Sequence, residues 1–282
     1  MLKTRVLTAL VLAICLLSAM FWLPESGWVL FCAVLMGAAA WEWCALAGLS
    51  NTLARGYPWM TAGLFVVLSW LHLPFNVLLG VLVGACLFWL VVAPIWLATK
   101  WCLRSAGDLN FLLGWALLLP AGLALLLLRR NAWLLLAVLM IAWVADSTAY
   151  FTGKALGRHK LAPSISPGKT WEGVGGAVLG VAMYLWLLPK SLISFSDSGV
   201  AASMLLQHVV WIACGVLLTA VCVVGDLLES LFKRQAGMKD SSHLLPGHGG
   251  ILDRIDSLLA LLPVAAAIYL TYLLFFSVSV AH

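Results

Sequence analysis

Residues 75–98 read FNVLLGVLVGACLFWLVVAPIWLA, a stretch of 24 residues without one charged side chain. A helix of about 20 apolar residues crosses the hydrocarbon core of a bilayer, because inside lipid each backbone N–H and C=O must be paired within its own segment. The whole chain is similar in character: 64% of its 282 residues are hydrophobic and 10% are charged, against roughly 25% charged residues in a soluble domain. The sequence therefore predicts an integral membrane protein and excludes a water-soluble fold.

Nine apolar runs of this kind predict nine transmembrane helices, and hence an all-α, polytopic membrane fold. The first run follows Lys3 and Arg5, as a secretory signal would, but its apolar core is long and leads straight into the second run, so we expect it to be retained. We expect residues 1–282 to form a single domain, with the catalytic part at about 142–260 and few motifs in the spans of residues 1–130. The nine runs lie near residues 6–23, 28–47, 58–72, 75–98, 111–128, 133–151, 174–189, 207–228 and 257–280.

Lysine and arginine accumulate in cytoplasmic loops, so their distribution over alternate loops predicts the orientation of the chain. With the N-terminus inside, 13 of the 16 basic residues are cytoplasmic, and Arg129, Arg130 and Lys190 are outside. The odd number of spans then puts the C-terminus on the outer side. The pair Arg129-Arg130 is the exception, and marks either a misplaced helix boundary or a position at the outer headgroups. The cytoplasmic residues are Lys3, Arg5, Arg55, Lys100, Arg104, Lys154, Arg158, Lys160, Lys169, Lys233, Arg234, Lys239 and Arg254.

The polar residues are concentrated in two stretches, 146–172 and 229–256, which hold 14 of the 27 charged side chains. Both stretches are predicted to be cytoplasmic, and each continues from a span that carries an acid, Asp146 or Asp226. An ionisable residue in or beside a membrane span is costly, so it indicates a function by default. The net charge of +5 suits a protein that faces anionic lipid and an anionic nucleotide. We expect no nucleic-acid partner.

Four polar residues in GDLLESLFKR (225–234) are spaced i, i+3, i+4 and i+7, so they share one face of a helix. They are Asp226, Glu229, Ser230 and Lys233. This face suits a carboxylate that binds a metal ion and a cation that neutralises phosphate. The alternative is the amphipathic end of a membrane helix, with a solvated Glu229 and with Lys233 reaching toward the headgroups.

The next segment, KDSSHLLPGHGGILDRIDS (239–257), contains a turn at 246–250 that cannot continue a helix and leaves backbone N–H groups available to a phosphate. Asp253 and Asp256 follow at i and i+3, at the start of the final span. Hard oxygen ligands suit Mg²⁺, which takes one or two carboxylates together with waters and substrate phosphates. A glycine-rich turn or a DxxD alone is common. Their combination with Asp226 across a basic loop indicates a nucleoside triphosphate bound with its metal.

Residues 230–256, SLFKRQAGMKDSSHLLPGHGGILDRID, resemble the signature of the phosphatidate cytidylyltransferase (CDP-diacylglycerol synthase) family. The match comprises S-x-x-K-R, K-D, P-x-H-G-G and D-R-x-D at the spacings of that family, with Ser242 where glycine is more usual. The segment SPGKTWEG (166–173) resembles a second hallmark of the family, SPxKTWEG. The resemblance extends over 146–173 and Gly225-Asp226, and more weakly to WEWCALAG at 41–48.

The resemblance implies that CTP transfers its cytidylyl group to phosphatidate, giving CDP-diacylglycerol and pyrophosphate in phospholipid biosynthesis. It implies that Asp226, Asp253 and Asp256 bind Mg²⁺, with a second cation as an alternative, and that these acids and Lys233 form the catalytic centre. It also implies a homodimer, and an active site on the cytoplasmic face of the inner (plasma) membrane, in contact with membrane lipids. The further substrate-binding residues expected are Arg234, Lys239, Asp240, His248, Gly249, Gly250, Arg254, Ser230, Lys169, Arg158, Ser166 and Asp146, with Lys169 and Arg158 assigned to the phosphatidate headgroup.

Two other functions remain open at this point. A CTP-dependent lipid-alcohol kinase would use the same nucleotide but would transfer the γ-phosphoryl group and release CDP. A transporter could use Glu42 and Asp146 along a pathway. Against a transporter, the charges cluster at one predicted surface, and no pair of interrupted spans is found in corresponding halves of the chain.

Overall fold

The computed structural model describes residues 2–71, 73–188 and 204–279, so Lys190 and the last three residues, which the orientation prediction used, lie outside the described ranges. Within these ranges the structure has nine helices and one 3₁₀ segment, η2. One of the nine helices is continuous through α4, the π-helical turn η1 and α5. The elements are α1 (Leu2–Trp22), α2 (Glu25–Ala47), α3 (Asn51–Trp70), α4 (Phe75–Leu87), η1 (Phe88–Val92), α5 (Ala93–Thr99), η2 (Leu103–Leu109), α6 (Asn110–Arg129), α7 (Ala132–Leu156), β1 (Lys160–Ala162), β2 (Ser166–Thr170), α8 (Trp171–Leu187), α10 (Met204–Gln235) and α11 (Leu252–Ser279).

The predicted all-α, multi-pass membrane architecture is confirmed. Six helices in the described ranges are long and apolar enough to cross a membrane, and two shorter apolar helices, Val6–Trp22 and Trp171–Leu187, accompany them. The remaining helix is α3, which starts at Asn51 instead of near residue 58, and runs through Pro58. Arg55 therefore lies on a helix and not in a loop.

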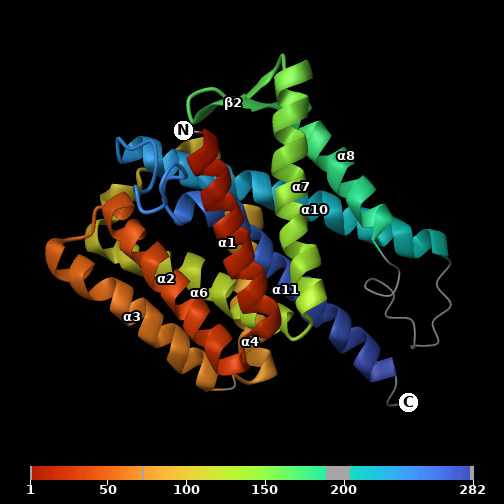
Figure 1. The fold of residues 1–282 in the computed structure, drawn as a ribbon, viewed down its shortest axis with the longest axis horizontal. Coiled ribbons are helices and arrows are strands. Elements are labelled where there is room, and N and C mark those ends of the chain that lie inside the picture. The colour runs from red at the N-terminus through yellow and green to blue at the C-terminus, as the bar shows by residue number, and fades with distance from the viewer. Residues whose placement is uncertain (1, 72, 189–203, 280–282) are drawn as a thin grey trace.

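The centre of the bundle is formed by α6 and α11, whose apolar stretches are mostly buried by their neighbours. Helix α11 packs against α10, α6, α4 and α7, while α1 lies at the periphery of the bundle (Figure 1). Several large side chains of α1, among them Leu7 and Ile14, are more than half exposed, as expected of a helix that faces lipid. The bundle thus has a buried core and an apolar exterior.

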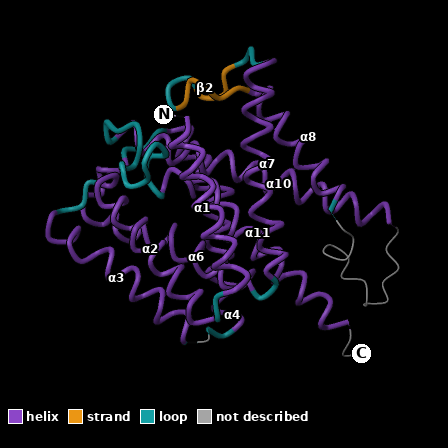
Figure 2. The backbone as a smooth tube through the Cα atoms, viewed as in Figure 1, coloured by secondary structure: helices purple, strands orange, loops and turns teal. Residues whose placement is uncertain are grey.

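One end of the bundle gathers most of the irregular backbone. Figure 2 shows the N-terminus, the β1–β2 hairpin and the loop before α11 at this end, and the C-terminal end of α11 away from it. The Thr8 hydroxyl of α1 donates a 3.2 Å hydrogen bond to the Pro246 carbonyl in that loop. The two polar stretches of the sequence therefore lie at the same end of the fold.

Helices α7 and α8 pack closely because α8 presents glycines to threonines of α7. A Cβ atom on Gly176 or Gly180 would overlap the side chain of Thr152 or Thr148, respectively. Gly173 likewise faces the Ala149 carbonyl, 2.9 Å from where its Cβ would lie. Small residues allow close approach of helices in membranes. This packing fixes the start of α8, and with it β2, against α7.

The exceptional pair Arg129-Arg130 has a structural explanation. The Arg129 guanidinium donates hydrogen bonds to the Met20 and Leu23 carbonyls at the end of α1 and lies over the Trp28 ring, 5.5 Å from its centroid. The carbonyls at the end of a helix have no partner within the helix, so Arg129 satisfies them. The predicted boundary between α6 and α7 is confirmed, since α7 begins at Ala132, after Asn131, whose side chain accepts hydrogen bonds from the Trp133 and Leu134 N–H groups.

Candidate active site

A cavity of about 410 Å³ lies among α7, β2, α8 and α10. Its polar lining includes Asp146 from α7, Ser166 and Lys169 of the SPGKTWEG hallmark on β2, and Asp226 from α10. Its remaining walls include glycines and apolar side chains. The residues singled out at 146–173 and at 225–226 therefore meet in one space.

The closest charged contact in this cavity joins Lys169 Nζ to Asp226 Oδ2, at 2.5 Å. Both side chains are about a quarter exposed, so the pair is accessible from the cavity. The Ser230 hydroxyl lies one turn further along α10 and donates to Asp226 Oδ1 at 3.4 Å. Asp256 lies within electrostatic range of Asp226 and Asp146. The cavity thus combines carboxylates with the ammonium groups of lysines, as a site for phosphates and a metal requires.

The antiparallel β1–β2 hairpin, which the sequence did not predict as strands, holds Ser166 and Lys169 over the cavity. Thr170 caps α8 by accepting a hydrogen bond from the Gly173 N–H. At the exposed edge, Glu172 accepts bonds from the His159 N–H and lies 2.6 Å from His159 Nδ1. A hydrogen bond from the backbone N–H of Glu172 to its own carboxylate, and then one from the His159 ring, lower the pKa of Glu172 to about 2.

Arg234, predicted to bind substrate, also supports the hairpin. Its Nε donates a 3.3 Å hydrogen bond to the carbonyl of Ile165, a buried residue in the turn between the strands. Helix α10 therefore holds the hairpin through Arg234, and Asp226 on the same helix lines the cavity.

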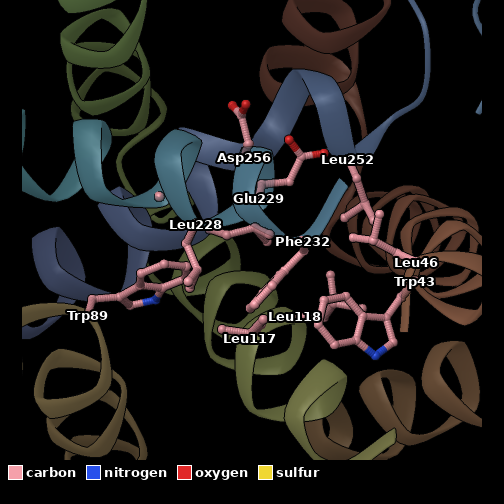
Figure 3. Close-up of a pocket in the computed structure, with 12 residues that line it drawn as sticks. Trp43, Leu46, Trp89, Leu117, Leu118, Leu228, Glu229, Phe232, Leu252 and Asp256 are labelled. Carbon is pink, nitrogen blue, oxygen red and sulfur yellow. The ribbon is translucent and has the colours of Figure 1, made fainter. Parts of the chain in front are cut away.

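A second, much smaller cavity of about 20 Å³ lies between α10, α11 and the N-terminal helices. Figure 3 shows Asp256 and Glu229 on one side of it, and the Trp43 and Trp89 rings on the other. A space of this size holds about one water molecule. It cannot hold a nucleotide or a lipid headgroup, so the 410 Å³ cavity is the candidate substrate site.

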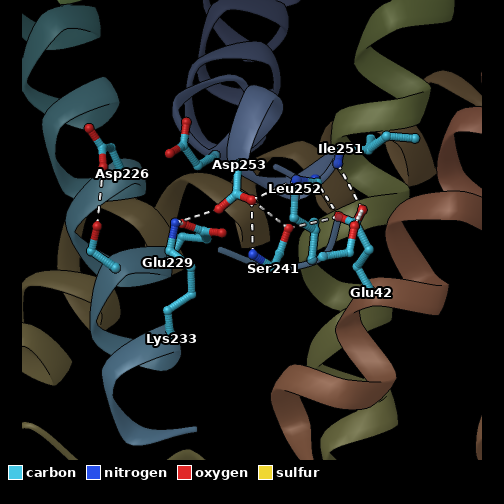
Figure 4. A network of polar contacts seen from close by, with 12 residues as sticks. Glu42, Asp226, Glu229, Lys233, Ser241, Ile251, Leu252 and Asp253 are labelled. Carbon is cyan, nitrogen blue, oxygen red and sulfur yellow. Dashed lines mark hydrogen bonds and ion pairs between the residues drawn. The ribbon is translucent and has the colours of Figure 1, made fainter. Parts of the chain in front are cut away.

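Lys233 lies in a buried polar network between α10 and α11 (Figure 4). Its Nζ donates to Asp253 Oδ1 at 2.6 Å and forms a second ion pair with Glu229. Asp253 Oδ2 accepts from the Gly250 N–H at 2.8 Å and from the N–H and hydroxyl of Ser241 at 2.8 and 2.9 Å. Both oxygens of Asp253 are therefore engaged, by the cation and by the loop before α11.

The glycines of the PGHGG turn have two different physical roles. Gly247 and Gly249 have φ values of 77° and 80°, a region that side chains with a Cβ rarely adopt. Gly250 has no such φ, but a Cβ there would lie 2.6 Å from both carboxylate oxygens of Glu42 and would also overlap the Ser241 hydroxyl. The turn is closed by the Leu245 N–H, which donates to the Gly249 carbonyl at 2.8 Å.

Glu42 of α2 is the site residue that sequence reasoning missed. It is 1% exposed and contacts the segment before α11, as Figure 4 shows. The sequence offered only weak signals, namely an acid in an apolar span and the faint family resemblance at 41–48. Its partners are about 200 residues away in the chain, so no local pattern could identify them.

The remaining predicted residues divide by location. Arg158, Lys239, Asp240 and Arg254 are exposed at the loop end, whereas His248 and Gly249 are partly buried within the turn. The described residues contain no group of three or more His, Cys, Asp or Glu side chains placed to hold a metal ion. Mg²⁺ commonly takes only one or two carboxylates with waters and phosphates. The carboxylates and the Ser166 and Thr170 hydroxyls that line the cavity are hard oxygen donors that fit this cation.

Comparison with known proteins identifies the family. Residues 3–273 match the model of the cytidylyltransferase family. The chain is similar to the phosphatidate cytidylyltransferases of Pseudomonas aeruginosa, with 40% identity over 95% of this chain and 97% of the relative, and of Haemophilus influenzae, with 36% identity over 95% and 99%. A Staphylococcus aureus phosphatidate cytidylyltransferase is 43% identical over 46% of each chain. On this match over nearly its whole length, the chain belongs to the cytidylyltransferase family.

Proposed function

We propose that this membrane protein transfers the cytidylyl group of CTP to phosphatidate, and so forms CDP-diacylglycerol and pyrophosphate. The observation that carries the proposal is the meeting of the SPGKTWEG hallmark, through Ser166 and Lys169, with Asp226 of α10 around one 410 Å³ cavity. This activity is the one named for the relatives that match nearly the whole chain. It makes the protein a nucleotidyltransferase of phospholipid biosynthesis.

The reaction joins two polyanions. A phosphate oxygen of phosphatidate forms a bond to the α-phosphorus of CTP, and the bond from that phosphorus to the bridging oxygen of the β-phosphate breaks, so that pyrophosphate leaves with the electron pair. A phosphate monoester is already mostly ionised at neutral pH, since its second pKa is about 6, and no general base is needed. The protein contributes positioning and charge neutralisation, the main sources of catalysis in phosphoryl-group transfers.

Lys169 is the residue we assign to the phosphatidate headgroup. Its ammonium lies in the cavity, where Asp226 holds it at 2.5 Å. An ammonium is a compact cation that can exchange a carboxylate for a phosphate. Arg158, exposed beside the hairpin, is a second candidate for the same group, and Asp146 and Ser166 complete the polar lining.

Mg²⁺ is proposed to bind Asp226, with Asp253 and Asp256 from α11, and when bound it would neutralise charge on the phosphates and on the departing pyrophosphate. Asp226 opens into the cavity. Asp253 would have to exchange one of its hydrogen bonds to Lys233, Ser241 or Gly250 in order to reach a metal. The number of cations stays a prediction.

The nucleotide is proposed to lie against the loop that precedes α11. Arg234 stands at the end of α10 before this loop, Lys239 lies in it, and Arg254 follows it on α11. Lys233 contacts Asp253 beside the loop, and His248 and the turn glycines belong to it. Lys233 neutralises Asp253 and Glu229 in the structure, so its proposed role is to hold the carboxylate of Asp253 in place beside the triphosphate. Ser230 and Asp240 are proposed to contribute polar contacts.

The active site is proposed to face the cytoplasm from the inner membrane, as the distribution of basic residues predicts. We also propose a homodimer, and a single domain over residues 1–282 with its catalytic part at about 142–260. The acyl chains of phosphatidate would remain in the bilayer while the headgroup reaches the cavity.

The test is to supply purified protein with phosphatidate and CTP that carries a label on either the α- or the γ-phosphate. Cytidylyl transfer moves the α-label into lipid and releases pyrophosphate. The γ-label entering lipid, with CDP released, would instead identify a lipid kinase and refute the proposal. Absence of any reaction, with lipid flux across a vesicle, would favour a transporter.

A further inference from the structure

We infer that Glu42 of α2 is a positioning residue for the transfer reaction: its buried carboxylate fixes the segment 241–252, and through that segment Asp253. This inference rests on the proposed function. It assigns a role to the N-terminal part of the chain, to which the sequence motifs assign none.

Four donors converge on the Glu42 carboxylate. Oε1 accepts from the Ser242 hydroxyl at 2.6 Å and from the Ile251 N–H at 2.8 Å. Oε2 accepts from the Ser241 hydroxyl at 3.0 Å and from the Leu252 N–H at 2.7 Å. Every one of these donors belongs to the segment 241–252. Glu42 itself is 1% exposed.

The position of Glu42 and that of Asp253 depend on each other. The Ser241 hydroxyl lies between their carboxylates, 3.0 Å from Glu42 Oε2 and 2.9 Å from Asp253 Oδ2. The Gly250 N–H also donates to Asp253, while the Gly250 Cα faces Glu42 so closely that no Cβ would fit. A shift of the Glu42 carboxylate would therefore displace both loop groups that orient Asp253.

Helix α2 provides a rigid base for this carboxylate. Arg104 Nη2 donates to the Ala45 carbonyl at 3.0 Å, and Asn110 Nδ2 donates to the Ala47 carbonyl at 3.3 Å. Both bonds hold the end of α2, one turn beyond Glu42. An ordinary helix N-cap uses a local Ser, Thr, Asp or Asn side chain. Here the start of α11 is held by an acid from another helix, so Glu42 also fixes the position of the start of α11 relative to α2.

The test variant is Glu42→Gln. An amide keeps one acceptor oxygen, so either the Ile251 or the Leu252 N–H faces an NH₂ group, while the nearby serine hydroxyl can turn to accept from it. The protein retains most of its contacts, but the segment shifts. We expect kcat to fall roughly 100-fold, as for displacements of about 1 Å at a catalytic group, and KM for phosphatidate to stay unchanged, because Glu42 contacts no residue of the hairpin.

The control is Glu25→Gln, the same chemical change at an exposed position at the other end of α2, which should leave kcat at the wild-type value. A double-mutant cycle combines Glu42→Gln with Ser242→Ala, whose hydroxyl bonds Glu42 at 2.6 Å. Loss of kcat in the double variant should be clearly less than the product of the single losses, because the two residues act through one contact.

A Glu42→Gln protein that is folded and has wild-type kcat would overturn the inference, as would equal losses in kcat and in phosphatidate affinity. If Glu42→Gln is not recovered as folded protein, Ser242→Ala alone decides: a several-fold lower kcat supports the inference and an unchanged kcat overturns it. Wild-type protein without turnover would instead refute the proposed function itself.

Discussion

The variant Asp253→Asn tests whether Asp253 is a catalytic carboxylate or only organises the loop before α11. The Asp253 side chain is 5% exposed and accepts four hydrogen bonds, one from Lys233 at 2.6 Å and three from Ser241 and Gly250 at 2.8 to 2.9 Å. An asparagine can place its oxygen toward the loop and keep those three bonds. Its NH₂ group then faces Lys233, which still pairs with Glu229.

The expected loss of stability is therefore that of one hydrogen bond to a charged group, about 1.5–3 kcal/mol. The expected loss of turnover is much larger, on the order of 10² to 10³-fold, as for the removal of one preorganised electrostatic contact at a reaction centre. The assay measures Mg²⁺-dependent pyrophosphate release by purified protein, with thermal unfolding and gel filtration in parallel. Asp108→Asn is the matched control, since it makes the same chemical change at an exposed carboxylate that accepts a 2.7 Å hydrogen bond from the Ser50 N–H.

Turnover of Asp253→Asn within about tenfold of the Asp108→Asn protein would refute the assignment, because a tenfold change corresponds to only about 1.4 kcal/mol. Asp253 would then be a structural residue, and the proposed metal ligands would be limited to carboxylates that open into the cavity.

Three further outcomes are expected. Lys169→Ala should raise KM for phosphatidate more than KM for CTP, and equal effects in steady-state kinetics would contradict its lipid role. Gly176→Leu should destabilise the protein by about 1–3 kcal/mol through overpacking, because its side chain would overlap Thr152. The control Gly175→Leu, which has no atom within 4 Å of its Cβ, should unfold at the wild-type temperature. Equal melting temperatures of the two variants would refute the close packing of α7 and α8. A chelator should abolish turnover and added Mg²⁺ should restore it, and activity that persists in excess chelator would argue against a divalent cation.

Much of the fold could be predicted from apolar runs, because the membrane requires long uncharged helices. The start of α3 was predicted too late, since residues 51–57 include Asn51, Thr52 and Arg55 and are too polar to extend an apolar run. The β1–β2 hairpin was not predicted because Ser166-Pro167-Gly168 is too short and irregular for an alternating pattern.

The candidate site could be predicted in part. Lys169 and Asp226 stand in motifs with fixed spacing, and the structure brings them together. The engagement of both Asp253 oxygens could not be foreseen, because it depends on Lys233 and on a folded loop. Glu42 contacts residues that are 199 to 210 positions away, and only the assembled bundle creates that proximity.

The arginine that binds the end of α1 also constrains the order of events during biosynthesis. The carbonyls of Met20 and Leu23 receive their partner from a residue 106 to 109 positions later in the chain. At roughly 5–20 residues per second, the ribosome needs about 5 to 20 s to make the intervening segment. The first helix must therefore wait in the bilayer, without this partner for its last carbonyls, until α6, the fifth helix, has been synthesised and inserted beside it.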